Sequence, residues 1–198
     1  AVTVDGSKIG SDATTTISGA SVTAQNTAGI YGKAGIDIDA TSVTVVGSKV
    51  QAGQFTQDAE GKYVATGTPA NLTIDTTTGN VDITGNAQVG ASGTAIVNAG
   101  DAVTVDGSDL ASIDALTVTG KNVKVEGGAN VVSHANVTVT GTDAVTVDGS
   151  KIGSDAKTTI SGASVTAQNA AIYGKTGIDI AATSDATGDV KIDKSRVQ

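Results

Sequence analysis

One five-residue pattern recurs along nearly the whole chain: an apolar residue, a polar residue, a second apolar residue, a polar residue and then glycine. It reads VTVDG at residues 2–6, 103–107 and 145–149, and LTVTG at residues 116–120. Two apolar side chains separated by one polar residue lie on the same face of a β-strand. The glycine allows the positive φ of a sharp corner, and Asn26 takes its place after VTAQ. The pattern predicts a series of short strands separated by corners.

The spacing of these strands distinguishes a series of hairpins from a coil. From Val103 onward the expected strands start six to eight residues apart, and every third strand is alike. Hairpins would reverse the chain at each corner, whereas three strands in every 20–22 residues are typical of a parallel β-solenoid. We therefore predict an all-β fold, a right-handed three-faced parallel β-helix of eight or nine turns. Turns stacked about 4.8 Å apart make a rod about 40 Å long.

The composition suits a narrow interior built from strands. The chain has no Cys, Met or Trp, one Phe and three Tyr, and its apolar residues are largely β-branched. Such residues favour strands over helices, and a thin interior has no room for Trp or Met. The net charge of −8 argues against nucleic acid and anionic membranes as partners. No apolar run approaches the roughly 20 residues of a membrane span, so no membrane insertion is expected.

Residues 53–70, GQFTQDAEGKYVATGTPA, interrupt the rhythm and contain the only Phe and the only Pro of the chain. We predict a hairpin that turns at DAEGK, projects from one corner and can be deleted over residues 55–64 without unfolding the rod. The chain is then a single solenoid over residues 1–198, with turns in 1–52 and 71–198. The candidate contact loop consists of Phe55, Asp58, Glu60, Lys62 and Tyr63.

A long duplication joins the two ends of the sequence. Residues 1–41 match residues 144–183, and within the first 26 positions the only difference is Thr14 against Lys157. The offset of 143 residues becomes 142 at Gly29, which has no counterpart in this alignment. The chain thus holds about one and a third copies of a module of about 143 residues, which suggests a segment of a longer repetitive filament.

Few residues are candidates for chemistry. Polysaccharide-cleaving enzymes share the solenoid class, but their sites need clustered carboxylates with a basic residue, and this chain has a single Arg, Arg196. His134 is the only histidine and is interpreted as a solvated corner residue. We therefore expect no enzyme activity, no cofactor and no metal site. Tyr31 and Tyr173 occupy equivalent positions in GIYGK and AIYGK and are expected to be exposed aromatic residues lying over a turn.

The cadence of VTVDGSKI, VTVVGSKVQAG and KIDKSRVQ resembles the haemagglutinin repeats of bacterial two-partner-secretion exoproteins. These repeats form the stalks of the filamentous-haemagglutinin and contact-dependent-inhibition type. The resemblance covers nearly the whole chain except residues 53–70. It implies a secreted or surface-tethered rod, located outside the cell or on the bacterial surface, that carries adhesive features outward.

Three functions remain open from the sequence. The chain is a structural rod segment of a filament or adhesin, mediating adhesion or matrix formation, or a subunit of an extracellular fibre that assembles head to tail, or a carbohydrate-binding or carbohydrate-active β-helix. The expected partners are neighbouring repeats or copies of the chain stacked end to end, and a receptor or glycan of a host or cell surface. Neither AVTV nor VKIDKSRVQ has a capping helix, so we expect both ends to be stacked.

Overall fold

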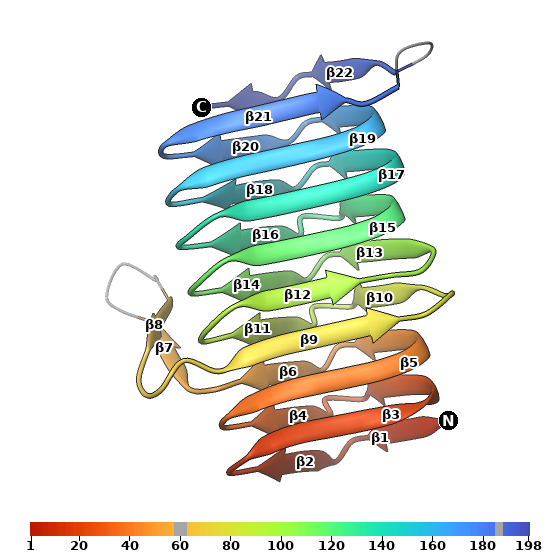
Figure 1. Ribbon diagram of the computed structural model, residues 1–198, viewed down its shortest axis with the longest axis vertical. Coiled ribbons are helices and arrows are strands. Elements are labelled where there is room, and N and C mark those ends of the chain that lie inside the picture. Colours follow the sequence, from red (N-terminus) through yellow and green to blue (C-terminus); the bar gives the residue numbers. More distant parts are fainter. Residues whose placement is uncertain (58–62, 185–187) are drawn as a thin grey trace.

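The chain winds into a stack of parallel strands in a computed structural model that describes residues 1–57, 63–184 and 188–198. These residues contain strands and no helix. In Figure 1 the near strands run from left to right, and the far strands return from right to left as the chain climbs from its N-terminus to its C-terminus. The coil is therefore right-handed. Nine parallel strands line one of its faces, so the described chain makes nine turns and the predicted parallel β-helix is confirmed.

Each turn crosses three faces. The first face holds four short strands, β1 (Val2–Asp5), β10 (Val81–Thr84), β13 (Ala102–Asp106) and β22 (Val190–Asp193). The second face is a separate sheet of β2 (Lys8–Ser11), β4 (Gly29–Gly32), β6 (Lys49–Ala52), β11 (Gln88–Ala91), β14 (Asp109–Ser112), β16 (Asn130–Ser133), β18 (Lys151–Ser154), β20 (Ala171–Gly174) and β23 (Arg196–Val197). The third face holds β9 (Asn71–Thr76), β12 (Ala95–Asn98) and β21 (Gly177–Ala182).

Five long strands bend from the third face into the first without a break: β3 (Thr14–Gln25), β5 (Gly35–Val46), β15 (Leu116–Glu126), β17 (Val137–Asp148) and β19 (Lys157–Gln168). The pairing of β17 with β19 shifts register at the bend, after Gly141. A Cβ on Gly141 would lie 2.2 Å from the carbonyl oxygen of Ala144, so glycine is required here by close approach of the backbone. The sequence had predicted a positive φ after every triplet. That prediction is wrong at this corner, because the strand continues around it.

The corner between the first and second faces follows the prediction. Gly107 and Gly149 have φ values of 55° and 59°, and Asn26 has 55°. This left-handed region is open to glycine and tolerated by asparagine, which explains the choice of residue there. The sharp corner lets consecutive strands leave the first sheet and enter the second within two or three residues.

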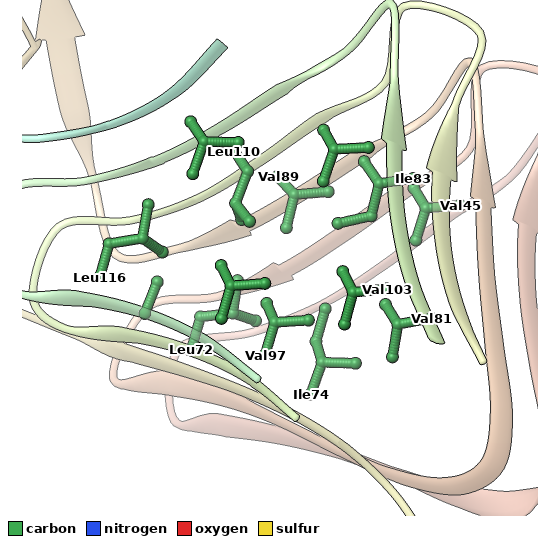
Figure 2. Packing of buried hydrophobic residues seen from close by; sticks show 14 of the residues in the cluster. Val45, Leu72, Ile74, Val81, Ile83, Val89, Val97, Val103, Leu110 and Leu116 are labelled. Carbon is green, nitrogen blue, oxygen red and sulfur yellow. The ribbon is translucent and has the colours of Figure 1, made fainter. Parts of the chain in front are cut away.

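The register of the strands places the apolar residues in columns. Val103 pairs with Val123 and Val123 with Val145, which are 20 and 22 residues apart, as the predicted turn length requires. On the second face Leu110 pairs with Val131 in the same way. Figure 2 shows side chains of all three faces meeting in the interior. Because these columns run from turn to turn, the hydrophobic core extends along the whole axis. Each fully buried Val, Ile or Leu side chain contributes roughly 1.5–3 kcal/mol to stability.

Two threonines occupy places in the apolar columns. Thr158 lies between Val137 and Ile178 on the third face and is fully buried. Its Oγ1 donates a hydrogen bond of 2.6 Å to the carbonyl oxygen of Tyr173, and Thr15 makes the same bond to Tyr31 in the first copy of the module. In the described residues no buried side-chain nitrogen or oxygen lacks a hydrogen-bond partner. The hydrogen bonds thus offset the cost of removing these hydroxyls from water.

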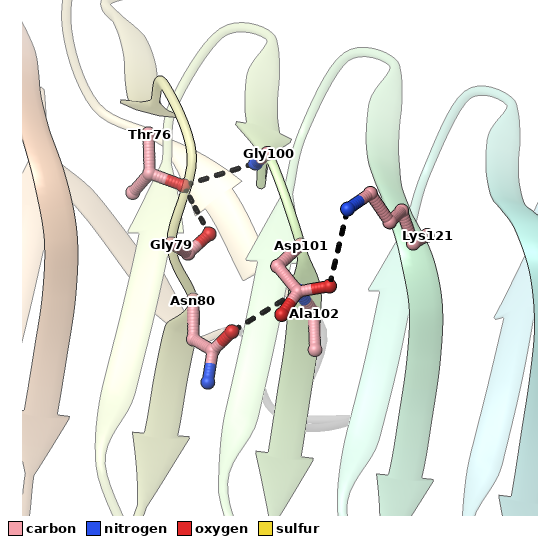
Figure 3. Close-up of polar contacts among 7 residues, drawn as sticks. All are labelled: Thr76, Gly79, Asn80, Gly100, Asp101, Ala102 and Lys121. Atoms are coloured by element: carbon pink, nitrogen blue, oxygen red, sulfur yellow. Dashed lines mark hydrogen bonds and ion pairs between the residues drawn. The ribbon is translucent and has the colours of Figure 1, made fainter.

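Where the long strands are interrupted, side chains hold the corner between the third and first faces (Figure 3). Thr76 Oγ1 donates to the carbonyl of Gly79 at 2.7 Å and accepts the N–H of Gly100 at 3.2 Å. Asn80 Oδ1 accepts the N–H of Ala102 at 3.2 Å. An exposed ion pair between Lys121 and Asp101, with an N–O distance of 3.7 Å, adds at most about 1 kcal/mol. The corner therefore keeps the register of the stack without a continuous strand.

Candidate binding surfaces

The interrupted rhythm at residues 53–70 corresponds to a hairpin beside the stack. Strands β7 (Phe55–Gln57) and β8 (Tyr63–Ala65) pair antiparallel and lie to one side of the coil (Figure 1). Of the predicted contact residues, Phe55 and Tyr63 belong to these two strands, whereas Asp58, Glu60 and Lys62 lie outside the described residues. The predicted antiparallel pair of strands is confirmed, whereas the predicted turn at DAEGK lies outside the described residues and the contacts of the hairpin with other molecules stay a prediction.

The register narrows the bounds of the insertion. Gly32 pairs with Ala52, and Gly35 pairs with Asn71, so Gly53 and Ala70 stand where Lys33 and Ala34 stand in the preceding turn. The N–H of Gly53 donates to the carbonyl of Gly32, as in a regular corner. A Cβ on Gly53 would lie 2.9 Å from that of Ala70, so the two ends of the insertion are adjacent. The inserted residues are therefore 54–69, and an ordinary two-residue corner remains when they are taken away.

Tyr31 and Tyr173 lie on the second face, six turns apart, or about 29 Å along the axis. Both side chains are half-buried and not exposed as the sequence predicted, because each ring lies against a neighbouring glycine. Tyr31 pairs with Gln51 of the next turn, and Gln198 follows the same ladder beside Tyr173. The two tyrosines therefore have the same kind of neighbour on their C-terminal side.

The two rings nevertheless point in different directions. A Cβ on Gly29 would lie 2.4 Å from the ring of Tyr31, so this ring covers its own strand. In the second copy Ala171 occupies the place of Gly29, and its methyl group fills that space. The ring of Tyr173 instead covers Gly153 of the preceding turn, where a Cβ would lie 2.1 Å from it. One methyl group thus redirects an aromatic side chain.

The same register corrects the alignment of the two copies. Gly29 pairs with Lys8, and Ala171 pairs with the equivalent Lys151, so Gly29 does have a counterpart. The residue without one is Thr27, which has a φ of 61°. The sequence alone could not place the gap, because NTAG and NAA align equally well in two ways.

Charge and burial act on Tyr173 in its new position. The Nζ of Lys151 lies 4.8 Å from the centre of the ring, which is a cation–π distance. Burial, and to a smaller degree the negative charge of Asp155, raises the pKa of the Tyr173 phenol above the usual range of tyrosine. The phenol is therefore held in its neutral form, which can both donate and accept a hydrogen bond.

Each tyrosine lines an open groove. The groove at Tyr31 has a volume of about 450 Å³ and is also lined by Asp12, Lys33, Gln51 and Gln54. A neighbouring groove of about 310 Å³ continues from it to the foot of the insertion at Pro69. A flat ring with amide, carboxylate and ammonium groups around it can bind hydroxylated or peptide ligands through stacking and hydrogen bonds.

The groove at Tyr173 repeats this set with a volume of about 540 Å³. It is lined by Asp155, Lys175 and Gln198, among others, which are equivalent to Asp12, Lys33 and Gln51. These polar residues were not among the candidates predicted from the sequence. Repeated short sequences could have identified them. The aspartates lie in the SD and the lysines in the YGK of both copies, and the glutamines end the SKVQ and SRVQ that follow first-face strands.

The remaining polar residues are spread over the rod. His134 lies at the corner between β16 and β17 and is half-buried, and its backbone N–H donates to the carbonyl of Ser112 at 3.3 Å. Among residues 1–57, 63–184 and 188–198 there is no group of three or more His, Cys, Asp or Glu residues that could hold a metal ion. The same ranges contain no helix that is long and apolar enough to span a membrane.

The duplicated grooves and the hairpin are thus the surface features that distinguish this rod from a plain stack of turns. No family model, no curated protein and no solved structure matches this chain.

Proposed function

We propose that the chain is a structural rod segment of a secreted or cell-surface bacterial filament or adhesin, which mediates adhesion or matrix formation. The observation that carries this proposal is the unbroken stack: β11, β14, β16 and β18 each pair with a strand of the turn before and a strand of the turn after. Hydrogen bonds along the axis and a core that extends through every turn make a stiff, elongated element. Such an element can hold a contact surface away from the envelope that anchors it.

The insertion supports a contact role for the side of the rod. Residues 54–69 leave and re-enter at a corner that needs only Gly53 and Ala70, so the hairpin is carried without disturbing the turns above and below. Loops on a rigid scaffold are where binding residues concentrate. The grooves beside Tyr31 and Pro69 lie at the foot of this hairpin and extend the surface that a receptor or glycan could contact.

The surface location is tested on intact cells of the source organism. Antibodies raised against the purified chain should label intact cells or their medium, and added protease should remove the label from the cells. A cytoplasmic protein stained in parallel is the control for leakage. Labelling that appears only after permeabilisation would contradict the proposal.

The contact role is tested with a matched pair of proteins. Beads coated with the full chain are compared with beads coated with a variant in which Gly53 is joined directly to Ala70. We expect the variant to keep the β-sheet circular dichroism and cooperative unfolding of the parent and to lose adhesion to cells or immobilised glycans. Equal adhesion by both proteins would show that the hairpin makes no contact, and unfolding of the variant would show that the insertion is a structural part.

A further inference from the structure

One column of the stack alternates strictly between serine and alanine. It is the position immediately before each strand of the second face, and along the chain it holds Ser7, Ala28, Ser48, Ala87, Ser108, Ala129, Ser150, Ala170 and Ser195. Turns therefore come in two types, here named serine-type and alanine-type after this residue. The SK, SD and SR of the sequence mark the first type, and the alanine two or three residues after the first-face strand marks the second.

The alternation has a hydrogen-bonding reason. The Oγ of Ser48 accepts the N–H of Ala28 on the preceding turn at 3.2 Å, and donates to the carbonyl of Val46 at 2.8 Å. The same pair of bonds recurs at Ser108, Ser150 and Ser195, where the N–H donors are Ala87, Ala129 and Ala170 at 3.0, 3.1 and 3.0 Å. A serine-type turn thus takes an alanine-type turn on its N-terminal side. The N–H groups of Ala28 and Ala129 also lie 3.2 Å from the carbonyl oxygens of Gln25 and Glu126, so the serine hydroxyl is a second acceptor for these buried groups.

The corners of the two types also differ in shape. Three of the four alanine-type corners have two successive residues of positive φ, namely Asn26 with Thr27, Gly85 with Asn86, and Gly127 with Gly128. The corner at Ala170 is shorter and has Asn169 alone. Serine-type corners have a single residue of positive φ before the serine, such as Gly149. Corners with a single left-handed residue follow one another at Gly149, Asn169 and Lys194, so the shape of the corner varies along the stack while the alternation of serine and alanine is kept.

The first turn has the sequence of the seventh, and within the described residues its strands β1 and β2 pair only with β3 and β4 of the following turn. Ser150 is buried and accepts the N–H of Ala129, whereas the equivalent Ser7 is exposed. Ile152 is 0% exposed where β18 pairs with β16, and the equivalent Ile9 is 38% exposed. The surface formed by β1, β2 and residues 14–19 of β3, here named the N-terminal end surface, is thus the same surface that residues 122–141 cover in the second copy.

We infer that the N-terminal end surface is a docking surface for one kind of partner, a parallel β-solenoid turn of the alanine type like the one that residues 122–143 place against the equivalent surface of the second copy. The occupant places its alanine N–H on Ser7 Oγ and its second-face strand on β2. This fit between two turns does not depend on whether the rod lies on the cell surface.

Direct stacking of one copy on another is unfavourable, because it would place two serine-type turns together. The C-terminal end surface is formed by β21, β22 and β23 and belongs to a serine-type turn, because Ser195 precedes β23. Placed against the N-terminal end surface of a second copy, it sets Ser195 against Ser7, and no two serine-type turns are adjacent in the part of the stack that the structure describes. Its exposed Val190, Ile192 and Val197 then meet the end surface without the alternation that every pair of turns in the stack obeys.

Two fusions of the full chain test the inference. In the first, residues 122–143 are added before Ala1, which recreates the junction of Asp143 with Ala144. In the second, the serine-type residues 102–121 are added at the same place. The readout is hydrogen exchange of the Lys8 and Asp12 amides, since the equivalent amides of Lys151 and Asp155 donate to Ala129 and Ser133. Amides of β10–β14 report in both fusions that the stack is folded.

We expect the first fusion to slow exchange at Lys8 and Asp12 by roughly tenfold or more, and the second to change it by less than about threefold. Ser7→Ala in the first fusion should speed exchange of the added alanine amide, and in the unfused chain it should change nothing. Equal protection by both fusions would overturn the preference for the alanine type. No protection by the first fusion, with β10–β14 intact, would overturn the docking surface, and filaments formed by the unfused chain in sedimentation would overturn it as well.

Discussion

The tetrapeptide KIGS occurs twice, as β2 at residues 8–11 and as β18 at residues 151–154. All four residues of β2 are exposed, whereas three of the four residues of β18 are buried. The local conformation is the same in both, and only the neighbours differ: β18 lies between β16 and β20, and β2 pairs with β4 alone. Burial in a solenoid is therefore a property of adjacent turns, not of the strand itself.

On the C-terminal sides of the two copies the difference in burial is reversed, so that the first copy is the more buried. Ile36 and Ile38 of β5 are 2% and 0% exposed beneath β9, whereas Ile178 and Ile180 of β21 are only partly buried. The first copy is thus covered on its C-terminal side and the second on its N-terminal side. Taken together, the two copies show that this stretch of sequence accommodates a neighbouring turn on both sides.

The largest expected difference between the copies comes from truncating the same isoleucine in each. Ile152→Ala should lower the free energy of unfolding by about 2–5 kcal/mol, because it leaves a cavity in the column of Leu110 and Ile172. Ile9→Ala should cost about 1 kcal/mol or less, because its side chain is already 38% exposed. Urea unfolding followed by circular dichroism measures both. Equal losses would mean that the first turn is covered in solution.

The serine of the same segment gives a smaller contrast. Ser150→Ala removes the acceptor of the Ala129 N–H and should cost about 1 kcal/mol, since the carbonyl of Glu126 lies 3.2 Å from that nitrogen and retains part of the bond. Ser7→Ala should change the stability of the unfused chain by less than about 0.5 kcal/mol, as is usual for an exposed residue. The exchange rate of the Ala129 amide is the direct measurement. If it does not rise in Ser150→Ala, the serine does not hold the corner.

A pair of equivalent glycines tests the position of the tyrosine rings. Gly153→Ala places a methyl group where the ring of Tyr173 lies, so the ring must move away from Lys151, at a cost of about 1 kcal/mol or less. Gly10→Ala meets only ordinary contacts at 3.5 and 3.7 Å with Tyr31 and should leave that ring in place. Ring proton shifts in NMR spectra distinguish the outcomes. A shift of both rings, or of neither, would contradict the different orientations.

The smallest effect concerns the phenol of Tyr173, whose pKa is raised mainly by burial. Above a pH of about 10 the unfolded chain loses this proton while the folded chain keeps it, so the folded state binds more protons and its stability falls as the pH rises. Below that pH both states are protonated and the group has no effect. Tyr173→Phe should reduce the loss of stability at high pH, measured by urea unfolding at pH 9 and above.

The phenol can also be titrated directly. In a chain carrying Tyr31→Phe and Tyr63→Phe, absorbance at about 295 nm reports Tyr173 alone, and its titration should lie above that of the unfolded chain in urea. Asp155→Asn should lower the pKa partway, because the charge of Asp155 is the smaller of the two causes. A titration that coincides with that of the unfolded chain would show that the ring is not buried.

Much of the fold could be predicted because one residue type repeats at one place in every turn. The spacing of Val103, Leu110 and Leu116 gave the three faces, and their partners in the next turn, Val123 and Val131, appear where the spacing puts them. The corner glycines of the third face were misjudged, because a pattern of apolar, polar and glycine residues does not say whether the backbone turns sharply or bends within a strand. Gly141 is required by the close approach of the Ala144 carbonyl, whereas Gly149 has open space around it and is required by its positive φ of 59°.

The candidate sites were less predictable, because they depend on pairs of residues from different turns. Tyr31 and Tyr173 were found from their repeated surroundings, but their half-buried rings point in different directions because Gly29 and Ala171, which the alignment placed wrongly, differ by a methyl group. The insertion was recognised by its composition, and its bounds shifted to residues 54–69 only when the register showed what Gly53 and Ala70 replace.

The sequence by itself determined the strands, the length of a turn, the absence of large core side chains and the duplication, because each of these is a matter of residue type and spacing along one chain. Only the tertiary structure decided which turn covers which. The burial of KIGS at residues 151–154, the orientation of the tyrosine rings and the hydrogen bonds between serine-type and alanine-type turns all depend on this. The physical reason is that these features arise from contacts between residues about 20 positions apart, and a single turn contains neither its own neighbour nor the hydrogen-bond partner that the neighbour provides.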